Sequence, residues 1–392
     1  MNPTANSFSL PRAFDSGAGI LVFGVGGGGG NAVERMIETD VRNVGFVCAN
    51  TDAQALGKSS AGVKIQMGQT GLGAGSRPEA GRAAAEGSLE DIHRALDGAH
   101  MVFIAAGMGG GTGTGAAPIV ARVARDKGIL TVGVVTKPFD FEGPRRTRQA
   151  EVGLAELESC VDSLIVVCNN NLLDVLGEDV TQEEAFAAGN DVLRNAVGGI
   201  SDVIHVPGLV NVDFEDVRTV MGERGRAMMG SACASGPDRA TKAAQGAVAC
   251  PLLDKVSLSG ARGILVLIAA RRQDFRLSES RSAMSVIRQR AAEGAHIIYG
   301  AAYDEALGEE MRVTVIATGL GSVAPTQAAL APSVGSVRLQ QKGRPAPSTG
   351  FFPTLTETVV LPSPVAAVGA GRVHVPQADV SRPSVWRTAR GG

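Results

Sequence analysis

Apolar residues in the first half of the chain fall into short continuous runs. These runs are ILVFGV, VGFVCANT, MVFIAAG, ILTVGVV and SLIVVC, and stretches of helical character separate them, from about Asn31, around SLEDIHRAL, after Ala116 and through RQAEVGLAEL. Continuous apolar strands are typical of a parallel sheet that helices cover on both faces. The pattern therefore predicts a doubly wound α/β domain, in which ligands bind beyond the carboxyl ends of the strands.

A long helix is predicted after the last of these strands. Thr181 followed by Glu184 makes a capping box, and apolar residues then recur at helical spacing until Pro207. A proline ends the pattern because it lacks the backbone donor that a helix interior needs. We expect a buried connecting helix, within a folded body that runs from about Gly19 to about Gly321 and holds two packed units.

The composition is that of an ordinary globular chain. It has 392 residues, of which 44% are hydrophobic and 19% charged, and its formal net charge of -2 gives no sign of a nucleic-acid partner. No apolar run approaches the roughly 20 residues that span a bilayer, and the first residues lack the basic and apolar segments of a signal peptide. We therefore expect a cytoplasmic protein.

The five cysteines are scattered along the chain and never form a CxxC pair. Neither a disulfide framework nor a zinc site is indicated, and no other metal site made of protein ligands is predicted. We expect the cysteines to be small buried residues.

Both ends of the chain are predicted to lie outside the folded body. Residues 1–18 show no periodicity, and residues 322–392 hold seven Arg or Lys against two acidic residues amid repeated Pro, Ala, Ser and Gly. Segments of this composition cannot bury enough apolar surface to offset the entropy of ordering them. We expect both segments to be disordered.

Two glycine-rich loops follow strands of the predicted sheet. The first, Gly24 to Ala32, fits the dinucleotide fingerprint, but a run of glycines matches that pattern trivially. The second, Gly107 to Gly115, comes later and contains Thr112 and Thr114. Two such loops at one sheet edge favour a polyphosphate, held by backbone N–H groups, with the two hydroxyls available for phosphate oxygens or a magnesium shell. A close-packed glycine hinge is the alternative, and no Walker-type GxxxxGK[ST] occurs.

The motif GGGTGTG in the second loop is the signature of the tubulin-like GTPases, and the chain resembles the FtsZ family among them. Between about Ile20 and Gly319, the blocks GVGGGGGNAV, NTDAQAL, GLGAG, MVFIAAGMGGGTGTGAAP, VVTKPFDFEG, NDVL, NVDFEDVRTVM, AMMG and LSGARG stand in that family's order. The resemblance implies a doubly wound parallel-sheet nucleotide domain, a long central helix and a second α+β domain with a mixed sheet. It also implies a GTPase that polymerises head to tail into protofilaments and forms the bacterial cell-division ring.

The resemblance also implies a domain plan. Residues 19–180 would form the GTP-binding domain, 181–206 the central helix and 207–321 a C-terminal GTPase-activating and polymerisation domain. Residues 322–392 would be a linker ending in a peptide that binds division proteins such as membrane tethers. In this chain the peptide is divergent, because Asp379, Pro383, Trp386 and Arg387 echo the family pattern with altered spacing and without its leucine.

GTP or GDP with Mg²⁺ is the implied ligand, and the family's motifs carry its binding residues to positions of this chain. Gly71 to Gly75 would lie near the terminal phosphate, and Glu142 and Arg146 would reach the ribose and phosphates, although Pro144-Arg145-Arg146 leaves open which arginine points inward. The binding residues are Gly26, Gly27, Gly28, Asn31, Gly73, Ala74, Gly75, Gly109, Gly110, Gly111, Thr112, Gly113, Thr114, Gly115, Glu142, Arg146, Asn190 and Asp191.

Asn190 and Asp191 lie on the predicted central helix and are assigned to the base. A carboxylate can accept hydrogen bonds from both N1–H and the 2-amino group of guanine, whereas adenine offers no such pair. From the sequence alone, a polar pair on the wet face of a helix is an equal alternative. The match at NDVL favours base recognition.

The segment NVDFED holds the catalytic candidates Asn211, Asp213 and Asp216. By its residues alone, Asp213 could simply cap the next helix, with Glu215 and Asp216 near the positive end of the dipole. The resemblance implies instead that this loop meets the GTP bound by the next subunit and that Asp213 and Asp216 orient or polarise the attacking water. Magnesium would offset the repulsion between carboxylates and triphosphate, and hydrolysis would depend on assembly.

Two departures from the family and two rival functions accompany this interpretation. Asn169-Asn170-Asn171 stands where the family commonly carries an Asn, an acid and a base, and ARRQDF from Ala270 to Phe275 is more basic than usual. One rival is a divergent paralogue that binds GTP and modulates another filament. The other is a Rossmann-type oxidoreductase that does not polymerise.

Overall fold

The structure is a computed structural model that describes residues 18–177, 179–205, 210, 212–249 and 258–320. All of these residues belong to one compact unit. The segments predicted to be disordered, 1–18 and 322–392, lie outside the described residues except for Ala18, so those predictions stay predictions.

Six parallel strands form the first part of the sheet, in the order β3-β2-β1-β4-β5-β6. Their chain order reverses between β1 and β4, and in doubly wound sheets a ligand crevice opens at this switch point, outside the carboxyl ends of the strands. The predicted fold class is confirmed. The strands are β1 Ile20–Val25, β2 Val44–Asn50, β3 Val63–Gln66, β4 Met101–Gly107, β5 Leu130–Lys137 and β6 Ser163–Cys168.

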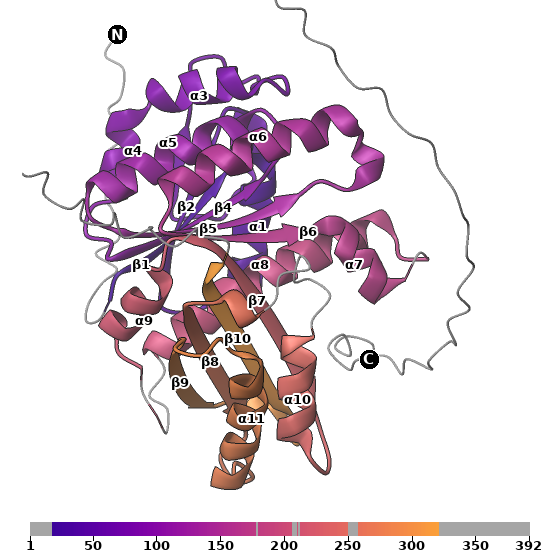
Figure 1. Cartoon of the computed structure of the whole chain (residues 1–392). Helices are drawn as coiled ribbons and strands as arrows, with labels where there is room; N and C mark the ends of the chain where they lie inside the picture. Colours follow the sequence, from indigo (N-terminus) through magenta and orange to yellow (C-terminus); the bar gives the residue numbers. More distant parts are fainter. Residues whose placement is uncertain (1–17, 178, 206–209, 211, 250–257, 321–392) are drawn as a thin grey trace, which may run out of the picture. The chain divides into compact units, whose positions relative to one another are not determined.

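Helices cover both faces of these strands (Figure 1). Along β4, Met101 and Phe103 enter the core beneath α1, whereas Val102 and Ile104 enter the opposite core beneath α4, α5 and α6. This two-sided burial explains why the strand is apolar at consecutive positions. The helices are α1 Gly26–Glu38, α2 Ala53–Gly57, α3 Pro78–Glu86, α4 Leu89–Ala95, α5 Thr112–Asp126, α6 Pro144–Cys160 and α7 Asn169–Leu176.

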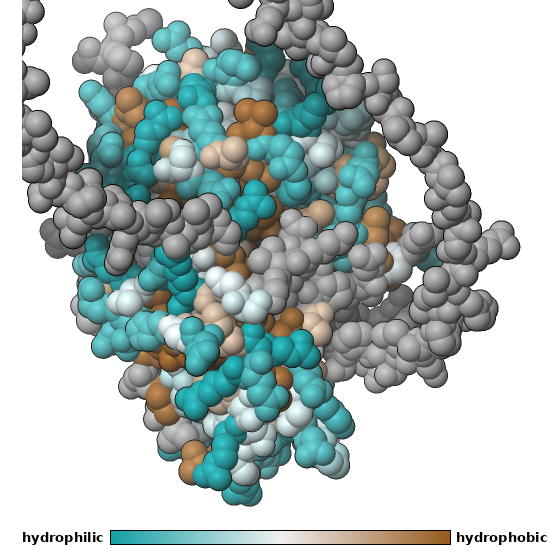
Figure 2. Space-filling view, in the orientation of Figure 1, coloured by the Kyte–Doolittle hydropathy of each residue, from teal (hydrophilic) through white to brown (hydrophobic). Residues whose placement is uncertain are grey.

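The outer surface of the α3–α6 layer is mixed in polarity. On the face shown in Figure 2, hydrophobic residues lie in small groups among hydrophilic ones. This is expected of helices that bury one side against the sheet and expose the other.

None of the described helices is both long and apolar enough to cross a membrane.

Two predicted helix starts are wrong, because both helices begin inside the glycine loops. α1 was expected from about Asn31 and begins at Gly26, and α5 was expected after Ala116 and begins at Thr112. Glycine disfavours a helix in isolation, but here it permits close packing. A Cβ at Gly29 would lie 2.2 Å from the Ala105 carbonyl oxygen of β4. The sequence analysis also did not predict β3, α2, α3 or α7.

The central helix is α8, Gln182–His205. The predicted capping box forms: the Thr181 backbone N–H donates to Glu184 Oε2 at 3.0 Å, and the Glu184 N–H donates to Thr181 Oγ1 at 3.2 Å. Leu193, Ala196 and Ile200 are buried along one side of the helix. Pro207, the expected stop, lies outside the described residues.

The second part of the sheet is mixed. β10 lies between β7 and β8 and is antiparallel to both, while β9 pairs in parallel with β8 at the edge. α10 and α11 cover one face of these strands. The elements are α9 Phe214–Met221, β7 Gly225–Ala234, α10 Arg239–Val248, β8 Gly263–Ala270, α11 Leu277–Arg290, β9 His296–Tyr303 and β10 Met311–Leu320.

The two parts share one ten-stranded sheet, because β7 pairs in parallel with β6. One hydrophobic core continues beneath both parts and contains Phe103 of β4, Leu193 of α8 and Ile316 of β10. The sequence predicted two packed units but not this junction, since strand pairing between distant segments leaves no local pattern.

Two of the four described cysteines are buried. Cys48 and Cys160 are buried, as expected, whereas Cys168 and Cys233 are partly exposed. Cys250 lies outside the described residues.

Candidate nucleotide-binding site

The two glycine loops meet backbone to backbone at the carboxyl ends of β1 and β4. A Cβ at Gly26 would lie 2.8 Å from the Gly113 nitrogen, and one at Gly28 would lie 3.0 Å from Gly107 Cα. By contrast, a Cβ at Gly27 or Gly110 would meet no atom within 4 Å. Gly26 and Gly28 therefore allow the two loops to touch. Gly27 and Gly110 leave bare backbone beside open space, where an anion can approach the N–H groups.

The third predicted loop, Gly71 to Gly75, joins them. The Gly73 N–H donates to the Thr51 carbonyl at 3.0 Å, at the end of β2, and Gly73 has a φ of 82°, which favours glycine. Ala74 is buried, and a Cβ at Gly111 would lie 2.8 Å from its methyl group. All three loops assigned to the phosphates therefore gather at one edge of the sheet.

Both signature threonines fix these loops. Thr114 is only 3% exposed, and its Oγ1 accepts a hydrogen bond from the Gly109 N–H at 2.9 Å. The Thr112 hydroxyl lies 2.6 Å from the Thr51 hydroxyl. Because a hydroxyl has one donor and two acceptor sites, these bonds add to the predicted phosphate contacts and do not replace them.

On the base side, Asp191 is held by an arginine that the sequence analysis missed. Arg35 Nε donates to Asp191 Oδ1 at 2.6 Å and Arg35 Nη2 donates to Oδ2 at 3.3 Å, so α1 and α8 are tied together. The hydrogen bond to Asp191 raises the pKa of Arg35 above its usual range. Asp191 is therefore not a freely solvated helix residue. Its two oxygens keep lone pairs for further donors, since a carboxylate can accept about four hydrogen bonds.

An aromatic cluster lies one turn before Asn190 on α8. Phe186 is 40% exposed, and its ring meets Phe139 edge to face with centroids 5.3 Å apart. Phe141, in a short 3₁₀ turn over Asp140–Glu142, stacks on Phe139 at 5.0 Å. An exposed ring one turn from the pair that is predicted to bind the base offers a flat apolar surface on which a purine can stack. The spacing of four residues between Phe186 and Asn190 was the signal that could have revealed it.

Glu142 and Arg146 pair with each other near the signature loop. Glu142 Oε2 lies 3.1 Å from Arg146 Nη1, and Glu142 Oε1 accepts from the Phe139 N–H at 2.9 Å. A Cβ at Gly109 would lie 2.6 Å from the Arg146 carbonyl oxygen, so the start of α6 packs against the loop. Of the two candidate arginines, Arg146 is thus the one whose backbone touches this loop.

Asn169 supplies an acceptor without a partner. It begins α7 directly after β6, is 6% exposed, and its Oδ1 has no hydrogen-bond donor among the described residues. A Cβ at Gly189 would lie 3.5 Å from this oxygen, so the amide faces α8 beside Asn190. Its neighbour Asn170 accepts from the Asp140 N–H at 3.0 Å. A buried acceptor left unpaired is costly, and a donor on a bound nucleotide would satisfy it.

The catalytic candidates lie at the other edge of the sheet. Asp213 caps α9, because its Oδ1 accepts from the Asp216 N–H at 2.8 Å, and its catalytic role stays a prediction. Phe214 meets His100, the residue before β4, with ring centroids 6.1 Å apart. Arg218 Nη2 donates to the carbonyl of Gly128, just before β5, at 3.3 Å. These contacts hold α9, the helix that Asp213 caps, at the amino ends of β4 and β5, whereas the glycine loops lie at the carboxyl ends of β1 and β4. Asn211 lies outside the described residues.

The predicted Mg²⁺ would take most of its ligands from the nucleotide and from water, with few from the protein. Within the described ranges, no group of three or more His, Cys, Asp or Glu residues gathers that could hold a metal. Mg²⁺ at a triphosphate commonly takes its ligands from phosphate oxygens and water, with one or two protein oxygens. The Thr112 hydroxyl, on the signature loop, is a protein oxygen available for this role.

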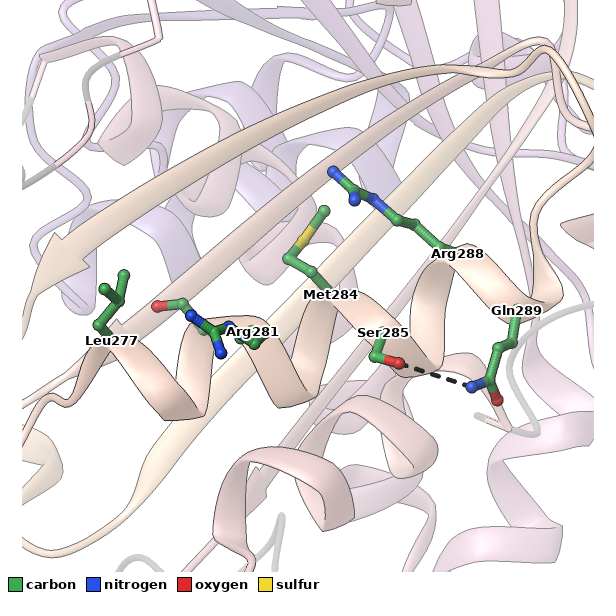
Figure 3. Close-up of a pocket in the computed structure, with 7 residues that line it drawn as sticks. Leu277, Arg281, Met284, Ser285, Arg288 and Gln289 are labelled. Carbon is green, nitrogen blue, oxygen red and sulfur yellow. Dashed lines mark hydrogen bonds between the residues drawn. The ribbon is translucent and has the colours of Figure 1, made fainter.

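A separate hollow of about 620 Å³ lies on α11 (Figure 3). One stripe of that helix lines it, with Leu277, Arg281, Met284 and Arg288 at successive turns. It contains no glycine loop, and its buried polar side chain, Ser280, already accepts a hydrogen bond from the Tyr299 hydroxyl at 2.9 Å, so it is not the nucleotide site.

The basic segment before α11 makes local contacts. Arg271 pairs with Asp274, and the guanidinium carbon of Arg272 lies 5.2 Å from the centre of the Tyr303 ring. Both arginines of ARRQDF therefore interact with residues of the C-terminal part itself.

Comparison with known proteins identifies relatives over most of the chain. The model of the Tubulin/FtsZ family, GTPase domain, matches residues 19–177, and that of the FtsZ family, C-terminal domain, matches residues 225–321. The cell division protein FtsZ of Coxiella burnetii is 52% identical over 318 residues, which cover 80% of this chain and 82% of the relative. That of Pseudomonas aeruginosa is 54% identical over 318 residues, 80% of each chain.

Solved structures agree. An FtsZ dimer from M. jannaschii superposes with a TM-score of 0.74 at 40% identity, covering 78% of this chain and 89% of that one. A GTPγS-bound protofilament of CetZ2 from Haloferax volcanii has a TM-score of 0.67 at 22% identity, covering 77% and 93%, and shows the shared fold alone.

Proposed function

The chain belongs to the Tubulin/FtsZ family of GTPases, and from this membership we propose that it polymerises head to tail into protofilaments that form the bacterial cell-division ring. As a member of that family it binds GTP and GDP and hydrolyses GTP. In the proposed filament, each active site is completed between adjacent subunits.

One observation carries this proposal. The glycine loops lie at the carboxyl ends of the parallel strands. Contacts with His100 and Gly128 instead hold α9 at the amino ends of β4 and β5. β4, which joins the two edges, has seven residues, and a strand of that length spans about 23 Å. A carboxylate that acts on the terminal phosphate must come within hydrogen-bond reach of the attacking water. In a catalytic role, Asp213 and Asp216 would therefore serve the nucleotide of another copy.

Within the nucleotide pocket, each group has a proposed role. Backbone N–H groups of Gly27, Gly28 and Gly110 would hold phosphate oxygens, and the Gly71–Gly75 loop would lie near the terminal phosphate. Asp191 would accept from the N1–H and 2-amino groups of guanine, and Asn190 and Asn169 would pair with remaining polar atoms of the base. The other binding residues are Gly26, Asn31, Gly73, Ala74, Gly75, Gly109, Gly111, Thr112, Gly113, Thr114, Gly115, Glu142 and Arg146.

At the junction, Asn211, Asp213 and Asp216 of the adjoining copy would position the attacking water. Phosphoryl transfer needs little covalent chemistry from the protein, so most of the acceleration comes from positioning and charge stabilisation. When bound, Mg²⁺ supplies positive charge that offsets the repulsion between these carboxylates and the triphosphate. Hydrolysis would then follow assembly and would be slow in an isolated subunit.

The two rival functions are less well supported. Identities above 50% over about four-fifths of the chain do not favour a divergent paralogue that modulates another filament. The oxidoreductase is disfavoured because the first glycine loop belongs to a matched GTPase domain that has a second phosphate loop.

We also propose that the protein acts in the cytoplasm at the mid-cell division site. Its tail, residues 322–392, would link the GTPase body to division proteins such as membrane tethers, through the peptide that contains Asp379, Pro383 and Trp386. These residues lie outside the described ones, and their altered spacing predicts altered partners.

Light scattering of the purified full chain tests the proposal. Addition of GTP with Mg²⁺ should raise the scattering, which should decay as GTP is consumed and return with fresh GTP. GDP and ATP serve as controls and should give no rise. For a modulating paralogue, the scattering would rise only when its partner filament is present. For an oxidoreductase, no nucleotide would raise the scattering.

A further inference from the structure

Arg77 lies against two of the loops that are assigned to the phosphates, Gly71–Gly75 and the signature loop. It precedes α3 and follows Gly75 by two residues. A Cβ at Gly111 would lie 2.9 Å from the Arg77 nitrogen and 3.1 Å from its carbonyl oxygen, so the Arg77 backbone touches the signature loop. A Cβ at Gly75 would lie 3.9 Å from Arg77 Nε. The side chain of Arg77 therefore passes close to Gly75, within the loop that is assigned to the terminal phosphate.

The charge of Arg77 is not neutralised within the part of the chain that the structure describes. Its side chain is exposed and forms no hydrogen bond or ion pair with a described residue. Nearby arginines differ, because Arg146 pairs with Glu142, and Arg82 pairs with Glu156. An unpaired guanidinium next to two anion-binding loops is available to a ligand.

The chemistry of that ligand follows from the geometry. A guanidinium is always charged and presents a planar fork of donors, which matches two oxygens of one phosphate group. The Gly71–Gly75 loop, close to which the Arg77 side chain passes, is assigned to the last phosphate of the nucleotide, whereas Gly26–Gly28 and Gly107–Gly113 lie nearer the switch point between β1 and β4. A contact from Arg77 would therefore be made with GTP and lost with GDP.

We propose that Arg77 binds the terminal phosphate of GTP and sets the preference of the pocket for GTP over GDP. This inference rests on the proposed function, since it uses the same pocket. It adds a residue outside the glycine loops, and it gives the chain a way to distinguish the two nucleotide states before any contact with the next subunit.

Nucleotide binding by the full chain tests this inference. Affinities for GTPγS and GDP would be measured by titration calorimetry with Mg²⁺, at protein concentrations below the assembly threshold. Arg77→Ala should weaken GTPγS binding about tenfold, the loss expected for one charge-assisted contact in an exposed site, and change GDP binding less than about twofold. Arg77→Lys should fall between, because it keeps the charge and loses the fork.

Arg94→Ala is the matched control. Arg94 is an exposed arginine on α4, whose last turn leads to the amino end of β4, and it pairs only with Asp91 of its own helix. Arg94→Ala changes the net charge by the same amount as Arg77→Ala, but at a site away from the phosphate loops. The affinities for GTPγS and GDP should therefore be unchanged. Should Arg77→Ala unfold in a thermal melt, the similarly shaped Arg77→Gln repeats the test.

Three results would overturn the inference. They are equal losses for GTPγS and GDP, no loss for either, and unchanged affinities with a raised assembly threshold, which would place Arg77 at the subunit junction instead. Failure of the proposed function is distinct, because it would appear in the unmodified protein, as no GTP-dependent rise in light scattering or as no binding of either nucleotide.

Discussion

The ring of Phe214 meets the ring of His100 edge to face, with centroids 6.1 Å apart. Phe214 is the first residue of α9, directly after Asp213, and His100 directly precedes β4. A buried hydrogen bond from Thr318 Oγ1 to the Val220 carbonyl, at 2.6 Å, holds the other end of α9. The helix that carries Asp216 is therefore fixed at the amino edge of the sheet, and β4 separates it from the phosphate loops.

Replacing Asp191, the carboxylate predicted to bind the base, should remove the preference for guanine. Asp191→Ala is expected to reduce the difference in binding free energy between GTP and ATP by about 1–3 kcal/mol, because the N1–H and 2-amino donors would lose their acceptor. Competition binding with GTP and ATP measures this difference. Arg35→Ala is the control, because it removes the arginine that holds the Asp191 carboxylate but keeps the carboxylate itself. It should therefore reduce the preference for GTP over ATP by less. Equal binding of GTP and ATP by the unmodified protein would refute the assignment.

A buried arginine should govern the stability of the C-terminal part. Arg239 has a side chain only 9% exposed; its Nε donates to Glu279 Oε1 at 2.7 Å and its Nη1 donates to the Glu309 carbonyl at 2.6 Å. The hydrogen bond to Glu279 raises the pKa of Arg239. Arg239→Ala should lower the free energy of unfolding by about 3–5 kcal/mol, since Glu279 would stay partly buried without its positively charged partner and keep only the hydrogen bond from the Arg276 N–H among the described residues.

Denaturant unfolding followed by circular dichroism checks this value. Arg42→Ala is the control, because Arg42 pairs with Asp40 at an exposed site and should change stability by less than about 1 kcal/mol. Similar shifts for the two variants would contradict the role given to Arg239.

Glu34 should make stability depend on pH in the acid range. Burial alone would raise the pKa of Glu34, but hydrogen bonds from the Ser60 N–H and the Ser59 hydroxyl lower it, on balance, below its usual 4.5. A carboxyl with a lowered folded-state pKa stabilises the fold above its unfolded pKa, and this contribution is lost as pH falls through the folded value. Glu34→Gln should therefore destabilise the protein at pH 7 and have a smaller effect below the folded pKa. A pH-independent difference between the two thermal melts would contradict this account.

The strands were predictable because both of their faces are buried. Met101 to Gly107 and Ser163 to Cys168 begin and end as predicted, since a strand covered on both sides is apolar at successive positions. The capping box at Thr181 was equally legible, because its two hydrogen bonds depend on residues three positions apart.

Features that depend on distant parts of the chain were not predictable. The helical start of α1 at Gly26 opposes helix propensity, and close packing against Ala105 of β4 permits it. The Arg35–Asp191 contact joins residues 156 positions apart, and the pairing of β6 with β7 depends on register between separate segments. None of these leaves a periodic signal, so only the folded arrangement reveals them.

A mixing experiment tests the shared active site most directly. Asp216→Ala should bind GTP and assemble but hydrolyse it slowly. Gly110→Leu should fold, because a Cβ at Gly110 meets no protein atom within 4 Å, and its side chain should block the phosphate pocket. Each variant alone should be nearly inactive.

Steady-state GTP hydrolysis by the mixture, measured as phosphate release, gives the answer. Some junctions in mixed filaments would join the intact pocket of the Asp216→Ala copy to the intact aspartate loop of the Gly110→Leu copy. The account predicts that activity returns in part and rises more than linearly with total protein concentration. If mixed filaments form and the activity is only the sum of the separate activities, catalysis occurs within one chain, and the assignment of Asp213 and Asp216 to the neighbouring nucleotide is wrong.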